Sequence, residues 1–308
     1  MAQTRKIGSI EVSLAGLGCN NFGMRVDADR TKQVIDAAID AGVTHFDTAE
    51  SYGGGKSEEF IGEALGKRRD QVVITTKVGS GDPERVATAI DASLQRLRTD
   101  HVDLYLLHRP DPEWPIAETV AAYARLVDAG KTREIGCSNF SAEQLEEAAT
   151  AARELGVTGF VNVQNHYSLL ERTPDAEVIP EIEKLGMSLV PYFPLASGML
   201  TGKYTRGEPA PEGTRLAAWG DRAGAFLSDE RFDVVERLGA YARDHGHTLH
   251  ELALSWVAGA PTVASVIAGA TSPEQVRANA EATEAWQITP DQRAEIDAIT
   301  AGQSMSWG

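Results

Sequence analysis

Cysteine is scarce in this sequence, since Cys19 and Cys137 are the only two among 308 residues. Two cysteines are too few for a disulfide scaffold, and they lack the spacing of a zinc site. Long apolar runs are also missing: no stretch approaches the roughly 18 uncharged apolar residues of a membrane-spanning helix, and no signal-peptide segment follows the first residues. We therefore expect a cytoplasmic protein with no membrane partner and no metal site.

Positive charge is outnumbered by negative charge. The chain has 29 Lys and Arg against 45 Asp and Glu, which gives a formal net charge of −16. A surface of this sign repels a phosphate backbone, so nucleic acid is excluded as a partner. The remaining composition is ordinary: 42% of residues are hydrophobic and 24% are charged, a mixture that supports a large packed core.

Short apolar runs alternate with amphipathic segments along the whole chain, after a hairpin predicted over residues 6–14. Eight of these runs are predicted to be strands: 15–18, 44–47, 73–77, 103–107, 134–137, 161–164, 188–192 and 263–267. Strict alternation of strand and helix is typical of a parallel sheet, and eight repeats favour closure of that sheet. The sequence therefore predicts an α/β protein, a (β/α)8 TIM barrel that forms a single domain over residues 1–308.

Two segments depart from the eightfold pattern. The connection after the seventh strand, residues 198–227, is roughly three times the usual length and rich in Gly, Pro and Arg, which is typical of a functional loop. An extra C-terminal helix is predicted to start at Thr289. Inside the pattern, Asp82, Ser141 and Ser272 are predicted to cap the helices that follow them.

Polar residues close the apolar runs at regular intervals of 26 to 31 residues, about one strand and one helix each. They are Asp47, Lys77, His108, Ser138 with Asn139, Gln164 and Tyr192. Each alone has a structural explanation, such as a cap or a satisfied core histidine. In a barrel, however, the C-terminal ends of the strands meet at one mouth, where active sites lie. The shared phase therefore predicts one polar site.

Tyr52, which follows Asp47 closely, adds a group that can exchange a proton at this mouth. A phenol holds its proton until about pH 10 unless a nearby cation favours the phenolate. Lys77 can supply that cation, Asp47 can keep the lysine charged, and His108 can donate a hydrogen bond to a carbonyl oxygen. We infer a proton-transfer site aimed at a carbonyl group.

Here the sequence resembles the aldo-keto reductase family. The resemblance rests on motifs at residues 46–53 (FDTAESYG), 75–78, 103–111, 136–140, 163–170 and 194–204, which follow the family's order over nearly the whole chain. It implies a (β/α)8 barrel whose catalytic residues are Asp47, Tyr52, Lys77 and His108. In that family NADPH usually delivers a hydride to an aldehyde or ketone substrate.

The resemblance also implies a set of cofactor contacts. The carboxamide of the nicotinamide is expected to contact Ser138, Asn139 and Gln164, and the nicotinamide ring is expected to stack on Tyr192. The family's loop over the pyrophosphate matches this sequence at Leu195, Ser197 and Lys203. The adenosine end is matched at Gly269, Thr271, Gln275 and Asn279, beside a helix start that offers free amides to an anion.

Cofactor choice and reaction direction stay open at this point. Many relatives bind the 2′-phosphate of NADPH with Lys or Arg at the positions of residues 269–275, but this stretch has no basic residue. NADP(H) is expected, with NAD(H) as the alternative, and the candidates for the phosphate contact are Arg206, Arg215 and Arg277. Two other functions compete with reduction: an NAD-linked sugar or alcohol dehydrogenase with phenolate Tyr52 as base, and a cofactor-sensing regulatory subunit like the potassium-channel β-subunits.

Two further groups have more than one interpretation. The histidines of residues 245–250 complete no metal-ligand spacing and are interpreted as the entrance to an apolar helix. Five aromatic residues are candidates either for the core or for an apolar substrate pocket: Phe22, Trp114, Phe193, Trp219 and Trp307.

Overall fold

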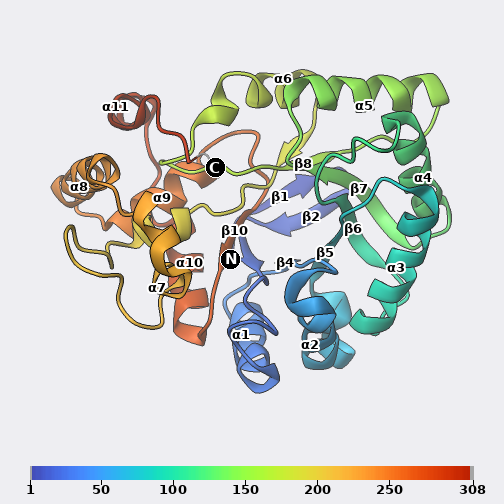
Figure 1. The fold of residues 1–308 in the computed structure, drawn as a ribbon, viewed down its shortest axis with the longest axis horizontal. Coiled ribbons are helices and arrows are strands. Elements are labelled where there is room, and N and C mark those ends of the chain that lie inside the picture. The colour runs from blue at the N-terminus through green and yellow to red at the C-terminus, as the bar shows by residue number, and fades with distance from the viewer. Residues whose placement is uncertain (1, 306–308) are drawn as a thin grey trace.

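The structure, a computed structural model, describes residues 2–305 and forms a (β/α)8 TIM barrel (Figure 1). Eight parallel strands lie in sequence order, with the last strand paired to the first. They are β3 (Ala15–Gly18), β4 (His45–Asp47), β5 (Val73–Val78), β6 (Val102–Leu107), β7 (Thr132–Ser138), β8 (Asn162–Gln164), β9 (Ser188–Leu189) and β10 (Val266–Gly269). A bridge between Leu189 and Val263 closes the remaining gap. The predicted fold class is confirmed.

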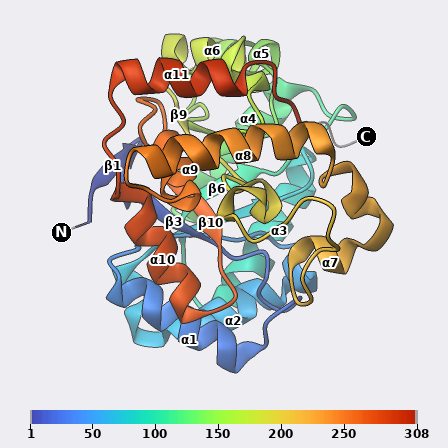
Figure 2. The same cartoon turned by 90° about the vertical axis from the view of Figure 1, so that its left-hand side faces the viewer.

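Helices alternate with the strands and cover the outside of the barrel (Figures 1 and 2). They are α1 (Ala28–Asp40), α2 (Lys56–Leu65), α3 (Pro83–Leu97), α4 (Ile116–Asp128), α5 (Ala142–Leu155), α6 (Val178–Leu185), α7 (Arg215–Trp219), α8 (Asp229–Asp244), α9 (Leu249–Ala258), α10 (Pro273–Glu284) and α11 (Pro290–Thr300). The side chains of Asp82, Ser141, Ser272 and Thr289 accept hydrogen bonds from the helices they precede, as predicted. Within residues 2–305, no helix is both long and apolar enough to cross a bilayer.

Two strand predictions are corrected by the structure. β9 ends at Leu189, because Pro191 has no amide to donate and Tyr192 makes only an isolated bridge. The eighth apolar run divides its pairing between both neighbours: Val263 bridges to β9, whereas residues 266–269 pair with β3. The last strand therefore starts three residues later than predicted.

A hairpin fills the N-terminal end of the barrel. β1 (Thr4–Ile7) pairs with β2 (Ile10–Ser13), so the hairpin begins two residues before the predicted start. Its buried apolar residues pack against Leu104 and Leu106 of β6, and they are Ile7, Ile10 and Val12. The hairpin leaves the opposite end, where the strands finish, as the open mouth.

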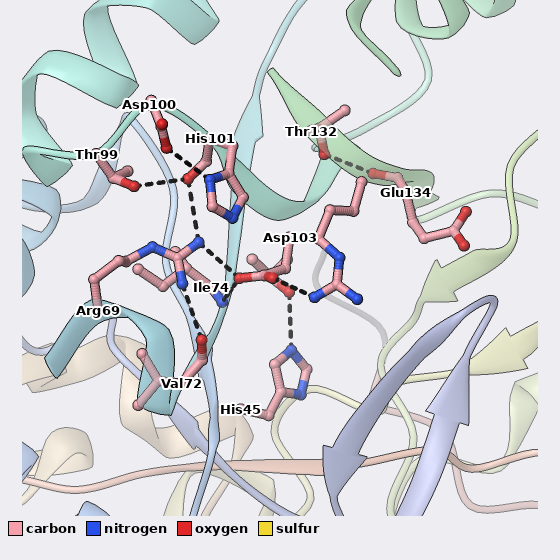
Figure 3. Close-up of polar contacts among 12 residues, drawn as sticks. His45, Arg69, Val72, Ile74, Thr99, Asp100, His101, Asp103, Thr132 and Glu134 are labelled. Atoms are coloured by element: carbon pink, nitrogen blue, oxygen red, sulfur yellow. Dashed lines mark hydrogen bonds and ion pairs between the residues drawn. The ribbon is translucent and has the colours of Figure 1, made fainter. Parts of the chain in front are cut away.

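Asp103 gathers a polar network near the starts of β5, β6 and β7 (Figure 3). Its carboxylate accepts hydrogen bonds from Arg69 Nη2 at 2.8 Å, from Arg133 Nη1 at 2.9 Å and from the backbone amide of Ile74 at 2.9 Å. The Asp103 side chain is only 4% exposed. Arg69 belongs to the turn η2 (Gly66–Gln71), so one carboxylate joins this turn to three strands.

Asp103→Ala should lower the free energy of unfolding by about 3–5 kcal/mol, because it leaves two guanidinium groups and an amide without their shared acceptor. Asp91→Ala is the matched control, since Asp91 pairs with Lys131 at the surface with 59% of its side chain exposed, and a loss of about 0–1 kcal/mol is expected there. Urea denaturation measures both changes. Equal losses in the two variants would contradict a stabilising role for the Asp103 network.

Candidate active site

A cavity of about 760 Å³ opens at the C-terminal ends of the barrel strands. Of the fifteen residues predicted for the site, the structure places fourteen on its wall: Asp47, Tyr52, His108, Ser138, Asn139, Gln164, Tyr192, Leu195, Ser197, Lys203, Gly269, Thr271, Gln275 and Asn279. Lys77 is the exception, because it is 1% exposed and lies against Asp47. The structure thus brings the predicted residues together at one mouth.

Lys77 and Asp47 form a buried ion pair between β5 and β4. Lys77 Nζ donates to Asp47 Oδ2 at 2.7 Å and to the carbonyl of Thr48 at 2.6 Å. Burial acts to lower the pKa of Lys77, but the attraction of Asp47 and the contact with Tyr52 outweigh it, so this pKa lies above its ordinary value. The site therefore holds a permanent ammonium beneath Tyr52.

Tyr52 begins the turn η1 (Tyr52–Gly55), in which Gly53 and Gly54 have φ values of 60° and 66° that favour glycine. Lys77 Nζ lies 5.1 Å from the centroid of the Tyr52 ring. Burial raises the pKa of the Tyr52 phenol, and the Lys77 ammonium offsets only part of this rise. The sequence-based expectation named the cation but not the larger effect of burial. At neutral pH the phenol keeps its proton.

His108 lies beside Tyr52 at the end of β6. The two rings are 5.8 Å apart at an interplanar angle of 78°. Burial, and then the Lys77 ammonium, lower the pKa of His108 to about 4. The imidazole is therefore neutral at pH 7, with one N–H that can be donated to a ligand oxygen.

Asn139 joins three neighbouring parts of the rim. Its Nδ2 donates to the carbonyl of His108 at 3.0 Å, and its Oδ1 accepts from the hydroxyl of Tyr192 at 2.7 Å. One face of the Tyr192 ring stacks on His166, with centroids 5.3 Å apart and planes 14° apart. These contacts hold the Tyr192 ring at the cavity wall.

Gln164 makes a contact that the sequence reasoning missed. Its Nε2 donates to Asp47 Oδ1 at 2.6 Å, although the two residues are 117 positions apart. Ser138 Oγ donates to the backbone carbonyl of Gln164 at 2.8 Å. The predicted carboxamide contacts are therefore linked to the buried ion pair.

Backbone strain is concentrated beside the cavity. Of the five non-glycine residues with positive φ among those described, four lie at its rim or next to it: Asn139, Phe193, Ala196 and Ser197. The last two belong to the tight turn η4 (Ala196–Thr201). Ser197 Oγ is buried and has no hydrogen-bond partner in the described chain. Strain and an unsatisfied hydroxyl at one turn indicate a binding role.

Three cations surround the same part of the cavity, namely Arg25, Lys203 and Arg215. Burial and then the repulsion of both arginines lower the pKa of Lys203, and burial and then Arg25 lower the pKa of Arg215. Like charges held this close favour a bound anion. Arg25 also donates to the carbonyl of Gly213, and Arg215 Nη2 donates to Asn20 Oδ1 at 3.2 Å. Residues 213–215 are thereby tied across the cavity to the loop after β3.

Two of the three arginines proposed for the 2′-phosphate lie elsewhere. Arg206 forms ion pairs with carboxylates of α8, with N–O distances from 2.5 to 3.3 Å. Arg277 lies on the outer side of α10, beside the end of α1. Arg215 is thus the candidate that the structure retains, and Arg25 is a lining cation that the sequence reasoning missed.

The predicted adenosine end contains a further residue that the sequence reasoning missed. His250 lines the cavity, and its Nε2 lies 2.9 Å from Asn279 Oδ1. Thr271 donates its amide to Gln275 Oε1 at 2.8 Å, just ahead of α10. The histidine segment does open a helix, α9, through a capping box at Thr248. Its third histidine points to the cavity as well.

The five aromatic candidates lie in different places. Phe22 is fully buried in the core, and Trp219 packs on Phe226 with ring centroids 5.1 Å apart. Phe193 lines the cavity, and Trp114 is half-buried outside the core. Trp307 lies outside the described residues.

Comparison with known proteins agrees with this geometry. The model of the aldo/keto reductase family matches residues 15–301. A probable voltage-gated potassium channel subunit beta from Oryza sativa subsp. japonica is 36% identical over 293 residues, covering 90% of this chain and 89% of the relative. The aldo-keto reductase YhdN of Bacillus subtilis is 33% identical over 307 residues, covering 94% and 90%. The solved glycerol dehydrogenase of Gluconobacter oxydans has a TM-score of 0.84 at 27% identity, covering 97% of this chain and 95% of that one.

The strand order and the polar cavity at the strand ends define a (β/α)8 barrel with its candidate site at the usual end. The chain belongs to the aldo/keto reductase family, so the resemblance read from the sequence is confirmed. It is an NAD(P)H-dependent oxidoreductase that acts on small-molecule substrates.

Two buried histidines should make the free energy of unfolding depend on pH. Burial lowers the pKa of His45 to about 4 and that of His166 to about 4. The ring of His45 lies 2.9 Å from Thr75 Oγ1. Both histidines bind protons more readily in the unfolded chain, where the pKa is about 6.5, so stability is lost as pH falls through that value toward 4. Each should remove about 2 kcal/mol between pH 7 and pH 5. Urea denaturation at the two pH values measures the loss, and His45→Gln should reduce it; an unchanged loss would show that His45 titrates normally.

Proposed function

We propose that the protein is an NADPH-dependent reductase that transfers a hydride to an aldehyde or ketone. In this proposal Tyr52 is the general acid, and Asp47, Lys77 and His108 assist it. The observation that carries the proposal is the Tyr52 ring 5.1 Å from a buried ammonium, in a site whose burial raises the pKa of the phenol. A proton donor of this kind suits reduction of a carbonyl, because the carbonyl oxygen gains a proton as its carbon gains a hydride.

Each side chain then has one task. When bound, the reduced nicotinamide supplies the hydride. Tyr52 gives its proton to the carbonyl oxygen, and the Lys77 ammonium stabilises the phenolate that remains. Neutral His108 donates a hydrogen bond to the same oxygen and holds the carbonyl against the phenol. Asp47 keeps the ammonium charged and fixed.

The chemistry of the cavity wall fits a dinucleotide. Its anionic bridge is matched by Lys203 and Arg25 and by the unsatisfied hydroxyl of Ser197. The remaining contacts proposed for it come from the strand ends, η4 and α10: Ser138, Asn139, Gln164, Tyr192, Leu195, Gly269, Thr271, Gln275 and Asn279. We infer NADP(H) over NAD(H), because Arg215 at the wall can pair with a 2′-phosphate.

Two other functions are supported by relatives of this chain. The glycerol dehydrogenase of Gluconobacter oxydans has the same fold, and this site run in reverse would oxidise an alcohol. The raised pKa of Tyr52 opposes that direction at neutral pH, because a base must first lose its proton. The rice channel subunit favours a regulatory role. Steady turnover of a carbonyl panel with NADPH would favour the reductase over both.

Two expectations from the sequence belong to the same proposal. Residues 1–308 form one domain, and the protein works in the cytoplasm without a nucleic-acid partner. Pairing of the last strand with the first supports the single domain, because both ends of the chain are needed to close one barrel. The net charge of −16 disfavours nucleic acid.

Tyr52→Phe should reduce turnover of a carbonyl substrate by about 10²–10⁴-fold while leaving cofactor binding nearly intact, because it removes the transferable proton and little else. Absorbance of the reduced nicotinamide measures turnover, and quenching of protein fluorescence measures binding. Tyr241→Phe is the control, since that hydroxyl bonds to Glu295 on the outer helices. A Tyr52→Phe enzyme that keeps more than about a hundredth of the wild-type rate would exclude Tyr52 as the general acid.

Arg215→Ala should weaken NADPH by about 1.5–3 kcal/mol, the size of a hydrogen bond to a charged group, and change NADH much less. Dissociation constants for both cofactors give the ratio directly. Arg206→Ala is the matched control, because Arg206 pairs with α8 and should leave the ratio unchanged. If Arg215→Ala also leaves the ratio unchanged, the assignment of the 2′-phosphate to Arg215 is wrong.

A further inference from the structure

The Asp47 carboxylate has one donor on each oxygen, and the two donors come from different strands. Lys77 Nζ on β5 donates to Oδ2 at 2.7 Å, and Gln164 Nε2 on β8 donates to Oδ1 at 2.6 Å. Gln164 is 2% exposed, yet it lines the cavity. Its side chain therefore connects the cavity wall to the buried ion pair.

The orientation of the Gln164 amide follows from this contact. A carboxylate paired with an ammonium accepts hydrogen bonds and does not donate them, so the NH2 group has to be the part that contacts Asp47. The carbonyl oxygen Oε1 is then left as an acceptor for a ligand. Gln164 can thus hold Asp47 and receive an N–H from the cavity at the same time.

The other two residues proposed for the carboxamide differ in this respect. Asn139 donates to the carbonyl of His108, and Ser138 donates to the backbone carbonyl of Gln164. Neither hydrogen bond ends on Asp47 or Lys77. Ser138 therefore offers a comparison in which a carboxamide contact can be changed without removing a donor from the ion pair.

We propose that Gln164 is a positioning residue that fixes the Asp47–Lys77 pair beneath Tyr52 while its carbonyl receives the carboxamide of the cofactor. The inference rests on the proposed function. Without the Gln164 donor, Asp47 Oδ1 is left unpaired in a buried site, and the carboxylate bonds more strongly to Lys77. The ammonium then stabilises the developing phenolate of Tyr52 less, so proton donation slows.

An introduced carboxyl at this position would test the donor specifically. Gln164→Glu keeps the shape of the side chain, but it can donate to Asp47 only while it carries a proton. The charged and titratable groups around Asp47 are His45 on its own strand and, from four other segments, Lys77, Tyr52, His108 and Cys19. These groups also titrate in the wild type. The kcat of the variant is therefore divided by the wild-type kcat at each pH.

The experiment measures kcat at saturating NADPH from pH 5 to pH 8 for wild type, Gln164→Glu and Gln164→Met. We expect Gln164→Glu to be active at low pH and to lose at least about tenfold relative to wild type as the introduced carboxyl ionises. Gln164→Met, which has no donor at any pH, should stay at least about tenfold below wild type with a flat ratio. Ser138→Ala should change the dissociation constant of NADPH and leave the shape of the pH profile as in wild type.

The outcomes separate this inference from the proposed function. If Gln164→Met turns over as fast as wild type at saturating NADPH, Gln164 does not act through Asp47, whereas Tyr52 can still be the acid. If Tyr52→Phe retains full activity, the proposed function itself fails. NADPH binding and thermal unfolding confirm that each variant is folded. Should Gln164→Met not fold, Gln164→Glu decides through the pH dependence of its rate relative to wild type.

Discussion

A carboxylate and an ammonium lie 2.7 Å apart at the centre of this barrel, both almost fully buried. Removing two charges from water is expensive, and such a pair persists only when further hydrogen bonds satisfy it. Here Thr48 and Gln164 provide them, so segments from three strands have to be in register before the charges are tolerated. The alignment of these strands and the placement of a cation beneath Tyr52 therefore depend on the same contact.

The two ends of the barrel differ in what their polar groups do. Near the strand starts, the Asp103 carboxylate is fully paired and the hairpin packs apolar side chains into the interior. At the strand ends, cations repel one another and non-glycine residues adopt left-handed backbone conformations. The first end stabilises the fold, and the second holds unfavourable interactions that a ligand can relieve.

Periodicity explains which parts of this site could be predicted. Asp47, Lys77 and His108 were found because parallel strands bring residues one repeat apart to the same edge. Arg25 lies on a loop and His250 lies on a helix. At these positions the repeat of strands and helices does not predict whether a side chain points to the cavity. Arg206 was one of three candidates for the 2′-phosphate, and its three carboxylate partners on α8 could not be foreseen because only the fold brings that helix near. The seventh strand is shorter than predicted because Pro191 has no amide to donate, and the pattern of apolar residues does not show this.

The crossing between residues 213–215 and the loop after β3 has a kinetic consequence. Arg25 bonds to the carbonyl of Gly213, while Arg215 bonds back to Asn20. The cavity can widen at this crossing only when both hydrogen bonds break. Under the proposed function, two arginines on the rim therefore contribute to the rate at which spent cofactor is exchanged for fresh, and neither of them is the proposed proton donor.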